Sequence, residues 1–200
     1  MNFVTLKKSI KGVDIYILDQ ILKGRYQAGA KILDAGCGNG RNLKWFYQQG
    51  FEIYGTDMHS GPTQTCKELY PTQKEYFTQA TVEQLPYKSN NFNHVICNAV
   101  LHFAKDLSHF SQMFDELLRV LKPHGTLFIR TASIFGLENE VIALENGNYK
   151  LPDGSTRFLL TATILEEIQN RNEISFIEDV KTTIVHSKRC MTTLMIEKKE

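Results

Sequence analysis

The chain has 200 residues, the length of one ordinary domain. Hydrophobic residues make up 42% of it, and 23 Lys and Arg nearly balance 22 Asp and Glu. This balance argues against a protein devoted to nucleic acid or to an anionic membrane surface, because such proteins usually carry a basic excess. We expect no membrane span, since no apolar run approaches about 18 residues. We also expect no secretory signal, since the N-terminal stretch before Gly12 lacks an apolar core.

The four cysteines lack the spacing of a metal site or a disulfide framework. They are scattered at positions 37, 66, 97 and 190, with no C-x-x-C pair and no histidine at zinc-ligand spacing. Two short pairs, Asp57-x-His59 and His102-x-x-x-Asp106, are of a kind that chance supplies readily. We therefore expect no metal site, and we expect free thiols in a cytoplasmic protein.

The predicted helices and strands alternate along the chain. Apolar residues at helical spacing predict a helix over residues 13–23, and the short apolar run 31–35 predicts a buried strand. Asp106 is a typical N-cap for a helix that Lys122-Pro123-His124-Gly125 ends, with one apolar face made of Leu107, Phe110, Phe114, Leu117, Leu118 and Leu121. The other predictions are a helix that carries Leu43 and ends at Gly50, helices over 62–69 and 161–170, and strands over 51–56, 75–80, 92–97 and 126–130.

This alternation is typical of one fold class. Strands and helices at this spacing predict parallel crossovers, hence an α/β, Rossmann-like doubly wound sheet with helices on both faces. The end of the chain differs, because strands predicted over 176–186 and 190–197 are joined only by Ser187-Lys188-Arg189. So short a link requires antiparallel neighbours, and the sheet is expected to be mixed at that edge. We expect a single domain over residues 1–200.

A glycine-rich stretch follows the strand at 31–35. Asp34-Ala35-Gly36-Cys37-Gly38-Asn39-Gly40 leaves that strand and enters a helix, where open α/β sheets bind ligands. The plainer alternative is a tight turn without a ligand. A dinucleotide fingerprint would need G-x-G-x-x-G, but Arg41 stands where the third glycine belongs after Gly36 and Gly38. The spacing therefore disfavours a nicotinamide or flavin oxidoreductase, which stays the third hypothesis.

A second acidic residue ends the next predicted strand. Asp57 lies 17 residues after Gly40 in the sequence. A carboxylate at that position can accept hydrogen bonds from both hydroxyls of a ribose. A lone aspartate at a strand end is common, but together with the glycine loop it indicates a nucleoside ligand.

Five segments in order resemble the class I S-adenosylmethionine-dependent methyltransferases, in the group of small type 11 and type 12 domains. They cover most of residues 31–130: the loop over 32–42, the acid Asp57, Glu83-Gln84-Leu85-Pro86-Tyr87, the fourth-strand block 92–103, and the helix–turn–strand block 117–127. The resemblance implies seven mostly parallel strands with an antiparallel C-terminal strand. It also implies S-adenosyl-L-methionine as the cofactor.

The resemblance implies a cofactor role for nine residues. The methionine and ribose portion would be bound by Asp34, Gly36, Gly38 and Gly40, and the ribose hydroxyls by Asp57. Asn98 would line the methionyl group, and Met58 would cover the adenine face or merely cap the next helix. Where many relatives carry an acid for the adenine amino group, this chain has Thr81 and Val82. Glu83 either substitutes for that acid or is a surface or capping residue.

The residues of the acceptor site are less specified. His102, just beyond the fourth strand, is the candidate catalytic base, with a structural histidine as the alternative. Tyr16, Arg130 and Tyr149 are further candidates to face the acceptor, and Arg25 is either a partner of the cofactor carboxylate or an exposed arginine. Residues 1–30 are expected to form a helical cap, and residues 133–160 either a lid or an ordinary connection.

These features predict a methyltransferase that acts on a small-molecule acceptor by in-line displacement. The alternative is a non-catalytic S-adenosylmethionine-binding domain that serves as a sensor or partner subunit. Methylation of DNA base amino groups is disfavoured, because Asn98-Ala99-Val100-Leu101 lacks the Asn-Pro-Pro motif of those enzymes. We expect no nucleic acid and no membrane as partner, and a homodimer stays open.

Overall fold

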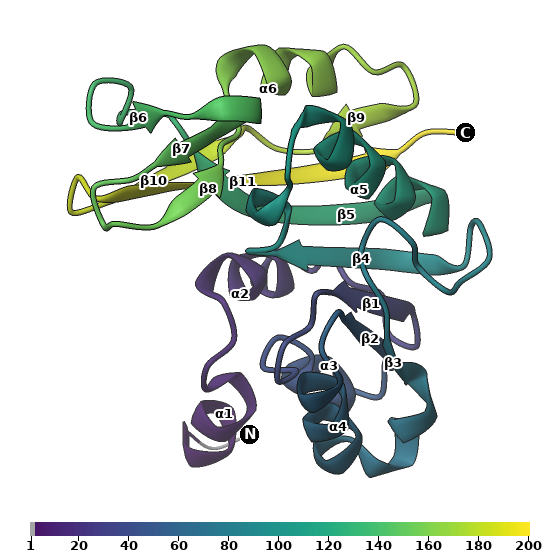
Figure 1. Ribbon diagram of the computed structural model, residues 1–200. Helices are drawn as coiled ribbons and strands as arrows, with labels where there is room; N and C mark the ends of the chain where they lie inside the picture. The colour runs from purple at the N-terminus through teal and green to yellow at the C-terminus, as the bar shows by residue number, and fades with distance from the viewer. Residues whose placement is uncertain (1–2) are drawn as a thin grey trace.

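A central sheet dominates the computed structural model, which describes residues 3–200 (Figure 1). Its strands are β1 (Lys31–Ala35), β2 (Glu52–Asp57), β3 (Phe77–Gln79), β4 (Phe92–Asn98), β5 (Leu121–Ser133), β9 (Ile174–Phe176), β10 (Lys181–Val185) and β11 (Arg189–Lys198). Seven of them lie side by side in the order β10-β11-β5-β4-β1-β2-β3, and β9 pairs with β11.

The pairing confirms the predicted fold class. β1 runs parallel to β2 and β4, β2 to β3, and β4 to β5. β11 runs antiparallel to β5, and β10 antiparallel to β11, as the short link between them requires. Because β1, β2 and β4 are parallel, their carboxyl ends meet at one edge of the sheet. That edge carries the segments that follow Ala35, Asp57 and Asn98.

Two hydrophobic clusters cover the two faces of the sheet. Successive residues of a strand alternate between them: Leu33 packs in one cluster and Ile32 in the other. The first face is covered by α5 (Leu107–Val120) and α6 (Ala162–Gln169), the second by α2 (Ile15–Leu22), α3 (Lys44–Gln48) and α4 (Ser60–Leu69). Each fully buried large apolar side chain, such as Phe46 or Phe114, stabilises the fold by about 1.5–3 kcal/mol. A further helix, α1 (Phe3–Ile10), contacts α3.

The connection between β5 and α6 forms a small sheet of its own. It consists of β6 (Ile142–Ala143), the 3-10 helix η3 (Glu145–Gly147), β7 (Asn148–Lys150) and β8 (Thr156–Phe158), paired antiparallel in that strand order. Figure 1 shows this sheet beside the β10–β11 end of the main sheet. Two further 3-10 helices are η1 (Pro71–Tyr76), which precedes β3, and η2 (Leu101–Phe103), which follows β4. No helix within residues 3–200 is long and apolar enough to cross a membrane.

Four local predictions were wrong. The strand predicted over 75–80 is only β3, because Pro71 begins a 3-10 helix that runs to Tyr76. The strand predicted over 176–186 is divided into β9 and β10, which pair with different parts of β11. β5 begins at Leu121 rather than at residue 126, with a register shift opposite β4. Leu107, predicted on the buried face of its helix, is 45% exposed because it lies in the first turn.

Candidate functional site

The glycine loop between β1 and α3 is fixed to the end of β2. The backbone N–H groups of Gly36 and Cys37 both donate to the carbonyl oxygen of Thr56, each at 2.8 Å. One residue further on, the Asp57 carboxylate accepts a hydrogen bond from the Gly38 N–H at 3.0 Å. The structure thus brings together the loop and the acid that the sequence analysis paired.

The three glycines of the loop have different reasons to be glycine. All three have positive φ angles, +78°, +50° and +72° for Gly36, Gly38 and Gly40, which side chains other than glycine rarely adopt. A Cβ on Gly36 would lie 2.3 Å from Val100, and one on Gly40 would lie 2.8 Å from the Cys66 sulfur. A Cβ on Gly38 would meet nothing within 4 Å. Gly38 is therefore the member of the loop that faces open space, while the other two permit close packing.

Asp34 is fully buried beneath this loop. Among the described residues, neither carboxylate oxygen has a hydrogen bond of normal length and angle. Burial raises the pKa of Asp34 to about 8, although the positive charge of Arg41 and the amide of Asn42 oppose the rise. An unsatisfied buried polar group costs about 1–3 kcal/mol, so the carboxyl group indicates a polar ligand at this point of the fold.

The Asn98 side chain, at the end of β4, is a second unsatisfied group. It is 7% exposed, and neither its oxygen nor its nitrogen has a hydrogen-bond partner within the described part of the chain. β4 lies next to β1, where Asp34 is opposite Ile96, two residues before Asn98. Two polar side chains without a hydrogen bond of normal geometry thus lie on neighbouring strands at the same edge of the sheet. A ligand with both donors and acceptors, such as the amino-acid part of the expected cofactor, fits them.

Asp57 retains the capacity to bind a ligand. Its two carboxylate oxygens accept one backbone N–H each, from Gly38 and from His59, both at 3.0 Å. A carboxylate has about four acceptor positions, so about two remain for ribose hydroxyls. The following Met58 side chain is 60% exposed, which leaves it free to cover a flat ring.

The residues expected near adenine divide into core and surface. Val82 is buried in the cluster under α5, whereas Thr81 is half-buried. Glu83 lies 3.4 Å from Nε2 of His109, so its carboxylate already has a neighbour away from the loop. Thr81 is the side chain of this segment that remains available to a ligand.

His102 is the middle residue of η2, and one of its ring nitrogens has a hydrogen bond. Its Nδ1 accepts a hydrogen bond from the backbone N–H of Ala132 at 3.2 Å. The neutral ring therefore carries its proton on Nε2. Burial, together with the charges of Arg157 and Arg130, lowers the pKa of His102 to about 4. Near neutral pH the ring is an uncharged hydrogen-bond donor at Nε2.

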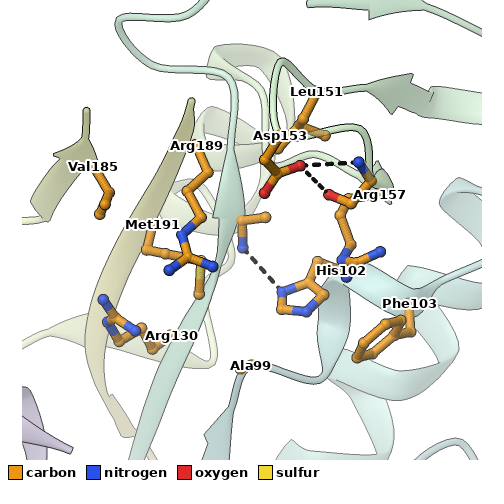
Figure 2. A pocket seen from close by; sticks show the side chains of 12 residues that line it. Ala99, His102, Phe103, Arg130, Leu151, Asp153, Arg157, Val185, Arg189 and Met191 are labelled. Atoms are coloured by element: carbon orange, nitrogen blue, oxygen red, sulfur yellow. Dashed lines mark hydrogen bonds between the residues drawn. The ribbon is translucent and has the colours of Figure 1, made fainter. Parts of the chain in front are cut away.

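A pocket opens beside His102 (Figure 2). Its volume is about 330 Å³, at the lower end of the range of about 300–1,000 Å³ for small-molecule sites. Ala99, the residue after Asn98, is one of the residues that line it. The Ala99 backbone N–H donates to the carbonyl oxygen of Arg130 at 2.7 Å. Ala99 has a φ of +63°, an unusual conformation of the kind that clusters at functional sites. The pocket thus adjoins the edge of the sheet that carries the glycine loop.

The pocket includes charged residues that sequence reasoning missed. Arg157 of β8, Asp153 of the preceding turn and Arg189 of β11 line it together with Arg130 of β5. No local sequence pattern marks these side chains, because they meet only through the pairing of distant strands. Leu151, Asp153, Ser155 and Arg157 come from the segment 133–160, so this insert forms a wall of the pocket.

Three other candidates occupy different places. Tyr16 packs against the Arg130 guanidinium at 5.2 Å from its ring centre and bonds Thr183 through its hydroxyl. Tyr149 packs in the cluster of the small sheet and does not line the pocket. Arg25 lies toward Glu178, with 3.9 Å between their nearest charged atoms, rather than at the glycine loop.

The N-terminal segment is attached to the glycine loop and to the pocket. Asp14 donates its backbone N–H to the side chain of Asn42 at 3.1 Å, and its carboxylate lies 3.5 Å from Arg130. Arg41, in turn, donates to the carbonyl oxygen of Gly12 at 2.9 Å. The predicted helical cap over residues 1–30 thus lies beside the site, apart from residues 1–2, which are outside the described residues.

Sequence comparison finds relatives of known class. The family described as "Methyltransferase domain" matches residues 33–129. A malonyl-[acyl-carrier protein] O-methyltransferase from Buchnera aphidicola is 28% identical over 78% of this chain and 60% of its own length. The chain spans less than two thirds of the length of this and the other first curated relatives it matches.

Solved structures share the fold. An S-adenosylmethionine-dependent methyltransferase from Methanosarcina mazei has a TM-score of 0.73 at 18% identity, over 90% of this chain and 97% of its own. The 1,6-didemethyltoxoflavin-N1-methyltransferase of Burkholderia thailandensis, solved with S-adenosylhomocysteine, has a TM-score of 0.69 at 17% identity, over 100% of this chain and 82% of its own. Sequence, strand order and the loop fixed to Asp57 therefore agree: residues 33–129 match the methyltransferase domain family, and the chain has the fold of solved S-adenosylmethionine-dependent methyltransferases.

Proposed function

We propose that this chain transfers a methyl group from S-adenosylmethionine to a small-molecule acceptor by in-line displacement. The observation that carries the proposal is the hydrogen bond from Gly38 to Asp57, with open space in front of Gly38 and a pocket that starts at Ala99 nearby. The named relatives act on different acceptors, one on an oxygen of malonyl-[acyl-carrier protein] and one at N1 of didemethyltoxoflavin. The family therefore supports the reaction and leaves the acceptor to be argued from the pocket.

The cofactor residues of the proposal follow from what each offers. Asp57 has spare acceptor capacity for the ribose hydroxyls, and the unpartnered groups of Asp34 and Asn98 suit the methionine portion. Exposed Met58 suits one face of adenine. Gly36, Gly38 and Gly40 shape the loop, and Thr81 and Val82 border the adenine, with the Thr81 hydroxyl in place of the usual acid.

The protein's own contribution to the chemistry is positioning. When bound, S-adenosylmethionine supplies an activated sulfonium methyl group. The chain has to hold an acceptor in line and keep water out, and such positioning contributes up to about 7–11 kcal/mol. The links from Asp14 to Asn42 and Arg130 support a role of the N-terminal segment as a cover of the site.

We assign His102 the role of a donor that orients the acceptor. Since Nδ1 accepts the Ala132 N–H, the ring presents Nε2–H to the pocket. Uptake of a proton would require the imidazolium, which the pKa of His102, about 4, opposes. An acceptor whose nucleophilic atom is already unprotonated needs no base at this position.

The experiment for this proposal targets Asp57. We expect Asp57→Ala to weaken S-adenosylhomocysteine binding at least tenfold in calorimetry, because it removes the ribose acceptor and the bond to Gly38. Wild type should also prefer adenosine to 2′,3′-dideoxyadenosine, and the variant should lose that preference. Unchanged affinity, or a preference that survives in the variant, would contradict the ribose assignment.

Transfer itself is measured with labelled S-adenosylmethionine and a broad panel of small acceptors. Label found in an acceptor supports the enzyme. Tight binding of S-adenosylhomocysteine without transfer to any acceptor would favour the non-catalytic binding domain.

We also propose a cytoplasmic location. All four cysteines are free and buried, and Cys37 and Cys66 approach to 3.9 Å between sulfurs without a disulfide. Free thiols suit a reducing compartment. The homodimer and the absence of nucleic-acid partners stay predictions.

A further inference from the structure

The pocket beside His102 concentrates positively charged side chains. The chain has a formal net charge of +1. Among the residues that line the pocket, however, the guanidinium groups of Arg130, Arg157 and Arg189 face a single carboxylate, that of Asp153. Figure 2 shows Arg130 and Arg189 on one side of the pocket and Arg157 with His102 on the other.

The single carboxylate is engaged within its own turn. Asp153 accepts hydrogen bonds from the Ser155 N–H at 2.9 Å and from the Ser155 hydroxyl at 2.6 Å. It forms no ion pair of 4 Å or less with an arginine in the described part of the chain. With Asp14 beside Arg130, two carboxylates stand against three guanidinium groups, which leaves a net positive charge at the pocket.

Two of the arginines pack on aromatic rings, and of these two only Arg130 also pairs with an acid. The Arg157 guanidinium lies 4.9 Å from the centre of the Phe103 ring and donates to the Thr156 carbonyl oxygen at 2.6 Å. Arg130 packs on Tyr16, its nearest carboxylate atom is 3.5 Å away on Asp14, and its buried Nε has no hydrogen-bond partner among residues 3–200. A ring contact fixes a guanidinium without neutralising it, so Arg157 keeps its charge, and Arg130, although paired with Asp14, keeps an Nε donor without a partner.

The third arginine is uncommitted. Arg189 begins β11 and is exposed, and its side chain has no hydrogen bond or ion pair within the described residues. Together with Nε2–H of His102, the pocket therefore offers donors from opposite sides, beside an apolar surface that includes Leu151 and Met191. Planar guanidinium donors match the two oxygens of a carboxylate or phosphate.

We propose that this pocket binds the acceptor through an oxyanion, so that the substrate is a small organic acid anchored by Arg130, Arg157 and Arg189 with its carbon skeleton on the apolar side. That the bound molecule is a substrate rests on the proposed methyl transfer. Anion binding at the pocket can be measured without that transfer. The oxyanion is a carboxylate or a phosphate, which arginine recognises by the same geometry.

The test compares three probes of similar size: benzoate, phenyl phosphate and neutral benzamide. Each is titrated into the isotope-labelled full chain, with and without saturating S-adenosylhomocysteine, and the amide signals of Ala99, Ala132 and Met191 are followed by NMR. We expect one or both anions to shift these signals and to bind at least tenfold more tightly than benzamide. The tighter of benzoate and phenyl phosphate identifies the oxyanion.

Variants connect the binding to the arginines. Arg157→Gln and Arg189→Gln should each weaken anion binding at least fivefold. Arg189→Lys should lose less of the anion affinity, because it keeps the positive charge. Arg171→Gln is the matched control, since it removes the same charge at a residue that pairs with Asp115 and Glu173 outside this pocket. S-adenosylhomocysteine affinity should stay within twofold in all four variants.

The outcomes separate the two proposals. Equal binding of benzamide and the anions, or no shift of the pocket signals by either anion at millimolar concentration, overturns the oxyanion pocket even if S-adenosylhomocysteine binds. Failure of wild type to bind S-adenosylhomocysteine contradicts the proposed function instead, and the titration without it still decides the pocket.

Discussion

Asp34 shows how one residue can link folding to ligand binding. It is a carboxyl group with no exposed surface and no hydrogen bond of normal geometry among the described residues. Burial raises its pKa to about 8, so the free protein holds it protonated at neutral pH. A ligand that supplies a hydrogen-bond partner or a positive charge would stabilise the ionised form. The cost of this buried acid is consistent with a role in binding rather than in stability.

We expect Asp34→Asn to stabilise the ligand-free protein more at pH 8 than at pH 5. The folded protein keeps a proton on Asp34 that the unfolded chain releases above about pH 4, so the contribution of Asp34 to the wild-type free energy of unfolding falls by about 1.4 kcal/mol per pH unit from about pH 4 to pH 8. The amide removes this slope. Urea unfolding across this range measures the effect.

Asp179→Asn is the control, because Asp179 is exposed and the same change there should leave the slope as it is. Parallel pH curves for wild type and Asp34→Asn would contradict the assignment of a protonated Asp34.

Among the elements, α2 has the most direct connection to the site. Its N-cap, Asp14, accepts the Tyr16 N–H at 2.9 Å, and the same residue bonds Asn42 and faces Arg130. At its other end Lys23 pairs with Asp19 and Glu178, each at 2.6 Å, which joins the helix to the segment before β10. The helix is thus placed between the glycine loop and the antiparallel edge of the sheet.

We expect Asp14→Ala to cost about 1 kcal/mol of stability through the lost cap, and also to weaken S-adenosylhomocysteine binding several-fold. The second effect follows because the Asp14 carboxylate, through Tyr16 and Arg130, fixes the start of α2, where the Asp14 backbone N–H donates to Asn42 at the end of the glycine loop. Denaturation and calorimetry measure the two effects separately.

Thr161→Ala is the matched control, since Thr161 caps α6 by accepting the Ile164 N–H at 3.3 Å, away from the loop. It should show the stability cost alone. Equal S-adenosylhomocysteine affinity of Asp14→Ala and Thr161→Ala would refute the coupling between the cap and the site.

The pH dependence of the whole molecule combines groups of opposite sign. Burial lowers the pKa of both His94 and His102 to about 4, so each contributes stability that is complete above about pH 6.5 and is lost as the pH falls toward 4. Asp34 acts in the opposite direction, because its contribution is lost as the pH rises toward 8. Below pH 6.5 the two histidines raise the free energy of unfolding with pH more steeply than Asp34 lowers it. Above pH 6.5 Asp34 acts alone.

We therefore expect the free energy of unfolding of the ligand-free protein to be greatest near pH 6.5. Each group contributes a slope of about 1.4 kcal/mol per pH unit within its range. Unfolding in urea at pH 5, 6.5 and 8 measures the curve. His94→Gln with His102→Gln should reverse the slope on the acid side, and a curve that rises steadily from pH 5 to pH 8 would rule out this balance.

Much of the fold could be predicted because its signals are local. The strand over 31–35 and the helix predicted to end at Gly50 depend on runs and spacings within a few residues, and both agree with the structure. Two of the four errors occurred where the pairing of distant strands decides. β9 and β10 look like one strand in the sequence, but β11 pairs with each of them separately.

The sequence alone was enough to place the glycine loop and Asp57 at one edge of a parallel sheet. A β-strand, a tight loop and a helix have few allowed geometries, so residues 31–57 determine that arrangement almost by themselves. The charge of the pocket is different. Arg130, Arg157 and Arg189 are separated by 27 and 32 residues, and they converge only through the register of β5 with β11 and the fold of the insert. Likewise, the tautomer of His102 depends on the backbone of Ala132, a neighbour that tertiary packing supplies.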